Sequence, residues 1–311
     1  MPASQRRGRR RGGTILVLAG SALTAAWLIG VLCGDRWWWS QWFLWLTGLI
    51  LIPGGLLLWG GLFLRRSRWH AAALLLPLIG GVEYVVPRWN PGHSPATGGV
   101  SILHWTAGPI GGSKSAYGEF IVGADPDLLI VEGARRAAST DVFRSWSAAR
   151  TVLFRGPFLI ASRFPVLQSR TIAWADDILL ISFVTELPSG EPLDILIVDL
   201  PSDPARSRWL VVNDLHALMT KVESEPDMII GDFNLTQTSW LLTKIREGYG
   251  PFWSRAGVGW GGTYPRAWPF YRLDHVLTPK GEGAVASITV IDPGCGRHRA
   301  QVIEYGGGDS R

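Results

Sequence analysis

Two long apolar runs near the N-terminus constrain the fold of this chain more than any other feature of its sequence. Thr14–Cys33 and Trp42–Leu64 contain no charged side chain, and a helix needs roughly 20 apolar residues to cross a membrane. Tryptophans, which favour membrane interfaces, gather between the two runs: Trp37, Trp38, Trp39 and Trp42. A cleaved signal peptide is the alternative for the first run, but a second run follows almost at once, without a soluble stretch after a small-residue cleavage site. We therefore expect at least two transmembrane helices.

A third run, Trp69–Val86, is a weaker candidate because it contains Pro77 and Glu83. Arginines precede the first run and follow the second, and the positive-inside rule places both groups in the cytoplasm. If the third run spans the membrane, the rest of the chain lies outside the cytoplasm. If the run lies on the membrane surface, the rest is cytoplasmic. We favour three spans and an extracytoplasmic domain, because Leu74–Val86 is too apolar for a linker.

The basic charge of the chain belongs to its membrane segment. Residues 1–86 hold nine arginines and two acids, so the 30 bases and 25 acids of the whole chain leave 21 bases and 23 acids for residues 87–311. The pI of about 9.5 is therefore little evidence for nucleic-acid binding, which needs a basic surface on the binding domain. The two cysteines, Cys33 and Cys295, lie far apart in the sequence, so we expect no disulfide partner and no zinc site.

Composition divides the chain into five parts. A basic tail (1–13) precedes the membrane segment (14–86), in which we expect two or three helices. The stretch "PRWNPGHSPATG" at 87–98 is rich in proline and glycine, which is typical of a linker. Residues 99–306 then form a domain, and 307–311 form a short tail.

The domain contains many short apolar runs of the length typical of buried strands. These predicted strands are Val100–Leu103, Leu128–Val131, Phe158–Ile160, Ile178–Phe183, Ile195–Val198, Met228–Ile230, Asp274–Leu277, Ser287–Val290 and Gln301–Ile303. Helix-like stretches lie between some of them, at Arg206–Val222 and Ser239–Glu247. Many short strands with few helices favour a layered α/β domain built on two packed sheets.

The stretch "DMIIGDFNLTQ" ends a predicted strand with polar residues. Asp232 and Asn234 alternate with Phe233, so both can point to one face while the ring points into the core. A carboxylate and an amide oxygen together can bind a hard cation such as Mg²⁺ and orient a water molecule or a phosphate. A plain turn is the alternative, since glycine, aspartate and asparagine all favour turns.

Other segments also place polar residues at strand boundaries. "DPDLLIVEG" ends a strand on Glu132, "FYRLDHVL" places Arg272, Asp274 and His275 at a strand start, and "CGRHRAQVIEY" puts His298 before the final strand. In this order, the segments resemble the endonuclease/exonuclease/phosphatase (DNase I-like) superfamily over about residues 99–306. "GDFN" with "RLDHVL" downstream is the specific combination. Membrane spans before such a domain look like a bacterial membrane-anchored subgroup.

The resemblance implies a four-layer α/β sandwich, in which helices flank the two packed sheets, and a role for each matched residue. Glu132 would bind the metal ion, Mg²⁺ or Mn²⁺, together with Asp232 and Asp274. Asp232 and Asn234 would hold the nucleophilic water and the phosphate, Asp274 would help to fix the site, and His298 would contact the scissile phosphate. The implied chemistry is in-line attack of water on a phosphorus ester, with metal and histidine neutralising the charge that develops on the phosphoryl oxygens.

Three positions depart from the family pattern. Thr106 stands where the family has asparagine, Asp199 where it has a catalytic histidine, and Arg297 where it has the aspartate that pairs with the histidine of the last motif. A cation at 297 is expected to lower the pKa of His298 and, if it points inward, to weaken Mg²⁺ binding. It could instead point to solvent or bind the substrate phosphate. Asp199 could supply a further carboxylate ligand or be a turn residue.

These features predict an integral membrane protein of the bacterial inner membrane that acts as a metal-dependent phosphoester hydrolase, of phosphodiesterase, phosphatase or nuclease type. A lipid headgroup, a nucleic acid and a small phosphate ester are all candidate substrates. The near-neutral domain disfavours long nucleic acids, and membrane attachment favours a lipid or envelope substrate. The three departures support an alternative, a catalytically degenerate member that acts as a membrane-anchored binding or scaffold protein. A membrane component whose soluble domain docks a partner is a weaker third possibility.

Overall fold

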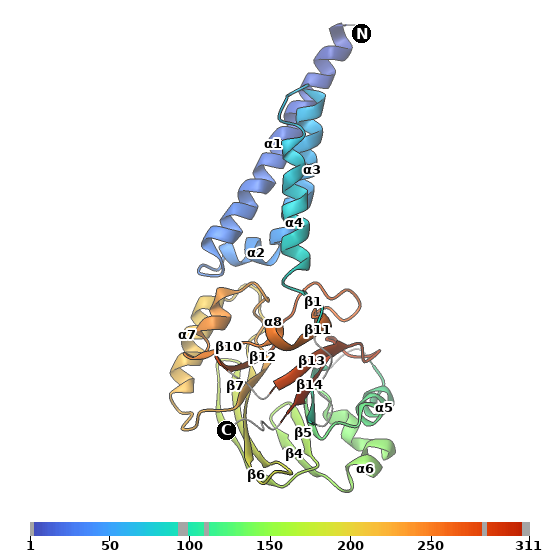
Figure 1. Ribbon diagram of the computed structural model, residues 1–311, viewed down its shortest axis with the longest axis vertical. Helices are drawn as coiled ribbons and strands as arrows, with labels where there is room; N and C mark the ends of the chain where they lie inside the picture. The colour runs from blue at the N-terminus through green and yellow to red at the C-terminus, as the bar shows by residue number, and fades with distance from the viewer. Residues whose placement is uncertain (1–2, 93–98, 109–111, 282–284, 307–311) are drawn as a thin grey trace. The chain divides into compact units, whose positions relative to one another are not determined.

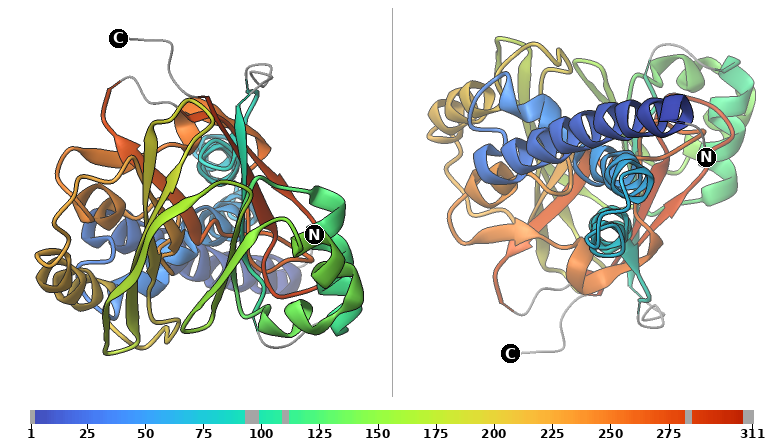
Figure 2. Two further views of the ribbon diagram at one scale, coloured as in Figure 1. Left: turned by 90° about the horizontal axis from the view of Figure 1, so that it is seen from below. Right: turned by 90° about the horizontal axis from the view of Figure 1, so that it is seen from above.

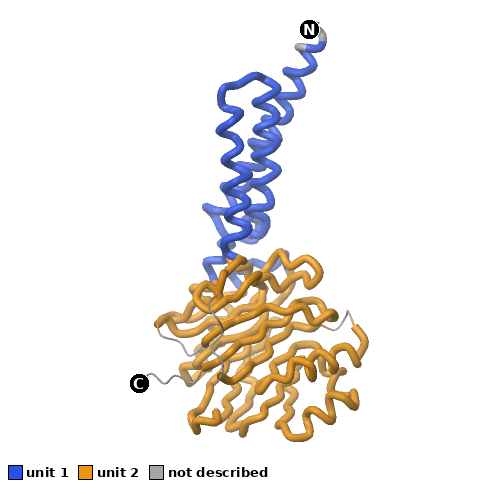
Figure 3. The backbone as a smooth tube through the Cα atoms, turned by 45° about the vertical axis from the view of Figure 1, so that its right-hand side comes forward, with its two compact units in different colours: residues 1–87, 204–210, 238–241 blue, residues 88–203, 211–237, 242–311 orange. Residues whose placement is uncertain are grey.

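The computed structural model describes residues 3–92, 99–108, 112–281 and 285–306. The chain divides into two compact units (Figure 3). The helical unit comprises residues 1–87 with two later segments, Pro204–Leu210 and Thr238–Leu241. The sheet unit comprises the rest, from Arg88 onward. Residues 93–98 of the predicted linker and the tail 307–311 lie outside the described residues.

Three helices lie side by side in the helical unit (Figure 1). These are α1 (Ala3–Cys33), α3 (Thr47–Leu64) and α4 (Leu75–Val85), joined by the short α2 (Ser40–Trp45) and by the 3₁₀ turn η1 (Ala72–Leu74). Glycines let α1 and α3 approach closely, since a Cβ at Gly20 would lie 2.7 Å from the carbonyl oxygen of Gly54. Close contact at small residues is typical of helices that pack within a membrane.

Two of these helices, over Arg7–Cys33 and Thr47–Leu64, are long and apolar enough to cross a membrane, by length and composition alone. The third predicted run forms only a shorter apolar helix, Ala72–Val85, below the roughly 20 residues of a full span. The acidic residue of this helix, Glu83, has a polar partner, because it accepts a hydrogen bond from Trp27 Nε1 at 2.7 Å. The two groups of arginines share one end of the helical unit, where Arg65 Nη1 donates to Thr14 Oγ1 at 2.9 Å.

The sheet unit contains two mixed β-sheets. The first runs in the order β1 (Trp89–Asn90), β11 (Gly257–Trp260), β13 (Val285–Ile291), β14 (Ala300–Tyr305), β2 (Val100–Thr106), β3 (Leu128–Glu132), β5 (Phe158–Ser162) and β4 (Thr151–Arg155). The second runs in the order β10 (Tyr249–Pro251), β12 (Asp274–Pro279), β9 (Met228–Asp232), β8 (Pro192–Asp199), β7 (Ile178–Glu186) and β6 (Val166–Ala175). The pairs β2–β3, β8–β9 and β11–β13 are parallel, and the other neighbours are antiparallel.

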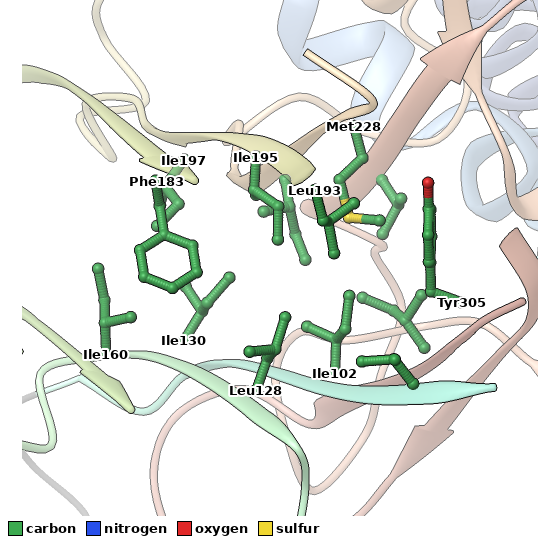
Figure 4. Close-up of a cluster of buried hydrophobic side chains, with 14 of the residues drawn as sticks. Ile102, Leu128, Ile130, Ile160, Phe183, Leu193, Ile195, Ile197, Met228 and Tyr305 are labelled. Carbon is green, nitrogen blue, oxygen red and sulfur yellow. The ribbon is translucent and has the colours of Figure 1, made fainter. Parts of the chain in front are cut away.

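The core lies between the two sheets. Ile102 and Ile130 of the first sheet point toward Phe183 and Ile195 of the second (Figure 4), and all four are at most 1% exposed. These positions alternate along their strands with residues of the outer faces, as a pleated sheet requires. The expected packing of two sheets face to face is therefore confirmed.

Helices cover the outer faces. Residues of α5 (Lys114–Ala124) and α6 (Asp141–Ser147) form a second core with the first sheet, in which Ile121 and Phe143 are buried. Figure 2 shows α7 (Arg208–Met219) on the opposite side of the sheet unit from α5 and α6. The remaining short helices are η2 (Arg135–Ser139), η3 (Trp240–Lys244) and α8 (Trp253–Ala256). The fold is thus two packed sheets flanked by helices, as expected.

Every strand predicted from the sequence is present, and each continues further at one or both ends. The predicted helix at Arg206–Val222 is α7, but Ser239–Glu247 contains only the 3₁₀ turn η3. The predicted linker begins within the first sheet, since β1 pairs with β11. The edge strands β4 and β6 were not predicted, because their exposed faces interrupt the apolar runs.

Gly231 in the "GDFN" stretch is required by a close approach of β8 to β9. A Cβ at this position would lie 1.7 Å from the carbonyl oxygen of Val198. Gly231→Ala is therefore expected to destabilise the protein by roughly 3 kcal/mol, at the upper end of the cost of overpacking. Unfolding of the full chain in detergent, followed by near-UV circular dichroism, measures the change. Gly123→Ala in α5 is the matched control, because its Cβ would meet nothing within 4 Å; equal losses in both variants would contradict the steric explanation.

Candidate active site

Polar strand ends from both sheets meet at one place in the sheet unit. In the first sheet, Thr106 at the end of β2 is in register with Glu132 at the end of β3. In the second, Asp232 at the end of β9 is in register with Asp199 of β8 and with Asp274 at the start of β12. Within each sheet, the parallel and antiparallel pairings place these residues at the same end of neighbouring strands.

Among the described residues, two groups of side chains come close enough to hold one metal ion. Glu132, Asp199 and Asp232 each offer an oxygen within 4.8 Å of the others, and so do Asp232, Asp274 and His298 with their oxygens and a ring nitrogen. Asp232 belongs to both groups, so it lies at the centre of the site. The structure thereby brings together five of the residues that the sequence nominated.

The "GDFN" residues each have a local reason for their place. Phe233 is fully buried and its ring meets His275 edge-on at 5.9 Å. Asn234 has a left-handed backbone with φ of 49°, which asparagine tolerates better than most residues. Its backbone N–H donates to Asp232 Oδ1 at 2.9 Å, and its side-chain amide donates to the carbonyl oxygen of Leu200 at 2.8 Å. Asn234 therefore fixes the Asp232 carboxylate and ties the β9 end to the segment after β8.

His298 is held by Asp274. His298 Nδ1 lies 2.8 Å from Asp274 Oδ2, and Thr106 Oγ1 donates to Asp274 Oδ1 at 2.6 Å. Burial alone would raise the pKa of Asp274, but its contacts with His298 and Thr106 lower that pKa well below the usual range. His298 Nε2 is left facing Asp232, 4.0 Å from Oδ2. The ring of Tyr264 packs at 4.9 Å from that of His298; no sequence motif marked this tyrosine.

Burial and mutual repulsion shift the pKa values of the carboxylates. Burial, reinforced by Asp274, raises the pKa of Asp232 to about 7. Burial, reinforced by Glu132 and Asp232, raises the pKa of Asp199 well above its usual value. The pKa of Glu132 is also raised, chiefly by burial. Negative charges thus crowd each other here, and a cation among them would relieve the repulsion.

The donor set of this group fits a hard divalent cation. Glu132, Asp199 and Asp232 are all carboxylates, and oxygen ligands suit Mg²⁺ and Mn²⁺. Asp274, also expected among the ligands, belongs to the second group, and its oxygens accept hydrogen bonds from Thr106 and His298.

The pKa of His298 is raised, contrary to the expectation that Arg297 would lower it. Burial lowers the pKa of His298, but attraction to Asp274 outweighs it and raises the value to about 9. The Arg297 side chain is exposed and lies against Gly108, where a Cβ would be 2.8 Å from its Cδ. Its charge instead acts on Glu132, whose pKa it lowers. Arg297 is thus exposed to solvent, whereas the adjacent His298 is buried in the site.

Arg272 contacts an aromatic ring and the segment after "GDFN". Its guanidinium is buried over the ring of Trp253 at 4.9 Å. Its backbone N–H donates to Gln237 Oε1 at 2.9 Å. His275 is also buried, with Nε2 at 2.9 Å from the carbonyl oxygen of Leu235. Both residues brace the segment after "GDFN".

Comparison with known proteins finds a matching family and similar solved structures. A sequence model of the Endonuclease/Exonuclease/phosphatase family matches residues 111–298. A solved structure of an endonuclease/exonuclease/phosphatase family protein from Bacteroides thetaiotaomicron is similar with a TM-score of 0.52 and 12% identity, covering 68% of this chain and 98% of that chain. An AP endonuclease from Archaeoglobus fulgidus is similar with a TM-score of 0.49 and 13% identity, covering 66% of this chain and 99% of that chain. The first likeness supports the fold alone, and no curated protein matches.

Proposed function

Because this chain belongs to the endonuclease/exonuclease/phosphatase family, we propose that it hydrolyses phosphoesters with the help of a divalent metal ion while α1 and α3 hold it in a bacterial inner membrane. One observation carries the proposal. The carboxylates of Glu132, Asp199 and Asp232 lie together with the His298–Asp274 pair, where strand ends of both sheets meet. A plain turn after β9 would not need a buried set of carboxylates with raised pKa values.

Each residue has a role in the proposed reaction. Glu132, Asp199 and Asp232 would hold Mg²⁺ or Mn²⁺, which when bound neutralises charge on the phosphoryl oxygens. His298, protonated near neutral pH because of Asp274, donates a hydrogen bond from Nε2 to the same oxygens. Asp232, steadied by the backbone N–H of Asn234, accepts a proton from the attacking water. The new P–O bond forms as the ester P–O bond breaks, and the leaving alkoxide takes its proton from solvent.

Hydrolysis of bis(p-nitrophenyl) phosphate by the full chain in detergent tests this function. We expect turnover with Mg²⁺ or Mn²⁺ and complete loss with EDTA, restored by added metal. A folded protein that binds Mn²⁺ by calorimetry but hydrolyses neither this diester nor p-nitrophenyl phosphate would contradict the proposal and favour the second candidate below.

A binding or scaffold protein is the second candidate, and Arg297 is the observation that favours it. The positive charge of Arg297 acts on Glu132, so it opposes a cation bound there. Arg297→Asp is expected to tighten Mn²⁺ binding roughly tenfold, because a charge change of two units near the site is worth a few kcal/mol at most at intermediate dielectric. Calorimetry measures the Mn²⁺ affinity of the variant. Arg299→Asp, which makes the same charge change two residues away, is the control. Metal-dependent hydrolysis seen only in Arg297→Asp would mean that Arg297 disables the site.

The orientation in the membrane can be predicted separately. Both arginine groups lie at one end of the helical unit, and the positive-inside rule assigns that end to the cytoplasm. We propose that Trp69–Val86, although its helix is shorter than a full span, also crosses the membrane, which makes the sheet unit extracytoplasmic. An alkaline phosphatase reporter fused after Arg311 is expected to be active, and a fluorescent protein that folds only in the cytoplasm is expected to be dark there. The opposite pair of results would contradict this orientation.

A further inference from the structure

We propose that the substrate is an amphiphilic phosphoester whose apolar chains stay in the bilayer while its phosphate enters the site. This inference rests on the proposed function and adds the substrate class. It follows from two segments of the later chain that are built into the helical unit, Pro204–Leu210 and Thr238–Leu241.

Buried polar contacts hold both segments within the helical unit. Gln41 Nε2 donates to the carbonyl oxygen of Pro204 at 2.7 Å, and the backbone N–H of Arg208 donates to Gln41 Oε1 at 3.1 Å. Asp35 accepts a hydrogen bond from Ser239 Oγ. Asp35 and Gln41 are fully buried, so these contacts are specific. A protein that needed only a tether would not require them.

The same part of the helical unit carries the side chains of a membrane interface. The rings of Trp209 and Trp240 stack at 5.4 Å, and the Arg36 guanidinium lies 5.8 Å from the Trp240 ring. Further apolar side chains of this part are exposed: Trp37, Trp38, Trp39, Trp42 and Leu210. Tryptophans and arginines together favour the headgroup layer of a bilayer, where Arg36 can attract an anionic headgroup.

The chain connects this layer directly to the carboxylates of the site. Asp199 precedes the first segment by five residues, and Asp232 precedes the second by six. At no more than ~3.6 Å per residue, the chain between each carboxylate and the first residue of its segment spans at most about 22 Å. The chain thus enters the two segments of the helical unit within six residues of two proposed metal ligands, Asp199 and Asp232. The near-neutral net charge of residues 87–311 gives no support to a polynucleotide substrate instead.

The full chain reconstituted in phosphatidylcholine nanodiscs tests this. With Mn²⁺, we compare dioleoyl phosphatidic acid and dioleoyl phosphatidylglycerol in the bilayer with their water-soluble dihexanoyl analogues and with bis(p-nitrophenyl) phosphate. We expect at least one long-chain lipid to be hydrolysed at least tenfold faster than its dihexanoyl analogue at equal bulk concentration, at a rate that follows its mole fraction in the bilayer.

Variants separate lipid access from chemistry. The double variant Trp209→Ala/Trp240→Ala is expected to lower hydrolysis of the preferred lipid at least fivefold while hydrolysis of the soluble diester stays within twofold. Trp174→Ala, an exposed tryptophan on β6 of the sheet unit, is the matched control and should change neither rate. Equal rates for long-chain and short-chain esters, or hydrolysis of the soluble diester with no lipid hydrolysed, would overturn the inference and leave the proposed function standing. No hydrolysis of any probe would mean that the proposed function itself fails.

Discussion

Asp232→Asn is expected to lower kcat for phosphoester hydrolysis by roughly a thousandfold, the middle to upper part of the range for a lost general base. Asp232 is shared by both groups of candidate ligands and faces His298 Nε2 at 4.0 Å. The amide keeps the size of the side chain but neither carries charge nor accepts a proton. Steady-state hydrolysis at saturating Mn²⁺ measures the loss, so that weaker metal binding does not account for it.

A misfolded variant would give the same loss, and stability distinguishes the two. Burial raises the pKa of Asp232 to about 7, so its ionisation destabilises the metal-free folded state increasingly as the pH rises from about 4 to 7. At pH 8 in EDTA, Asp232→Asn should therefore unfold at the same temperature as the parent or higher. Asp227→Asn is the matched control, because it makes the same exchange at the other end of β9, outside the candidate site. There the carboxylate accepts a hydrogen bond from the backbone N–H of Asp194. An inactive Asp232→Asn with a lowered Tm, or an active one, would contradict the assigned role.

The sequence predicted the buried strands because burial on both faces leaves a continuous apolar run. Leu128–Val131 and Met228–Ile230 are of this kind, and both are central strands. The edge strand β6 could not be predicted in the same way, since most of its residues are exposed. The α5 helix was missed because "KSAYGEFIVGA" contains two glycines and no continuous apolar stripe. Local composition thus predicted the centre of each sheet better than its margins.

The candidate site was predicted one strand end at a time, and its pairings were not. A polar residue after an apolar run is visible in sequence, which is how Glu132 and Asp232 were found. That Asp274, rather than the residue at 297, holds His298 depends on the register of β12 with β9 and on the place of the loop before β14. The effect predicted for Arg297 on His298 was wrong for the same reason, because the first side chain is exposed and the second is buried.

Asp274→Asn is expected to lower kcat by roughly a hundredfold to a thousandfold at pH 8, although Asp274 acts only through His298. Attraction to Asp274 raises the pKa of His298 to about 9 against burial, which alone would lower it. Without the Asp274 carboxylate, the strongest attraction that opposes burial is lost, so the pKa of His298 falls and less of it is protonated at pH 8. Because the reaction uses protonated His298, activity falls as the pH rises through this pKa. The variant should therefore lose activity at a pH at least one unit lower than the parent.

The pH dependence of kcat for both proteins measures this shift, and Thr106→Val provides the comparison. That variant removes the other hydrogen bond to Asp274 but leaves the charge beside His298, so its alkaline limb should move much less. A purely structural role for Asp274 would lower kcat equally at every pH. An alkaline limb that does not move in Asp274→Asn would therefore show that Asp274 does not set the charge of His298, and the catalytic role of that charge would have to be abandoned.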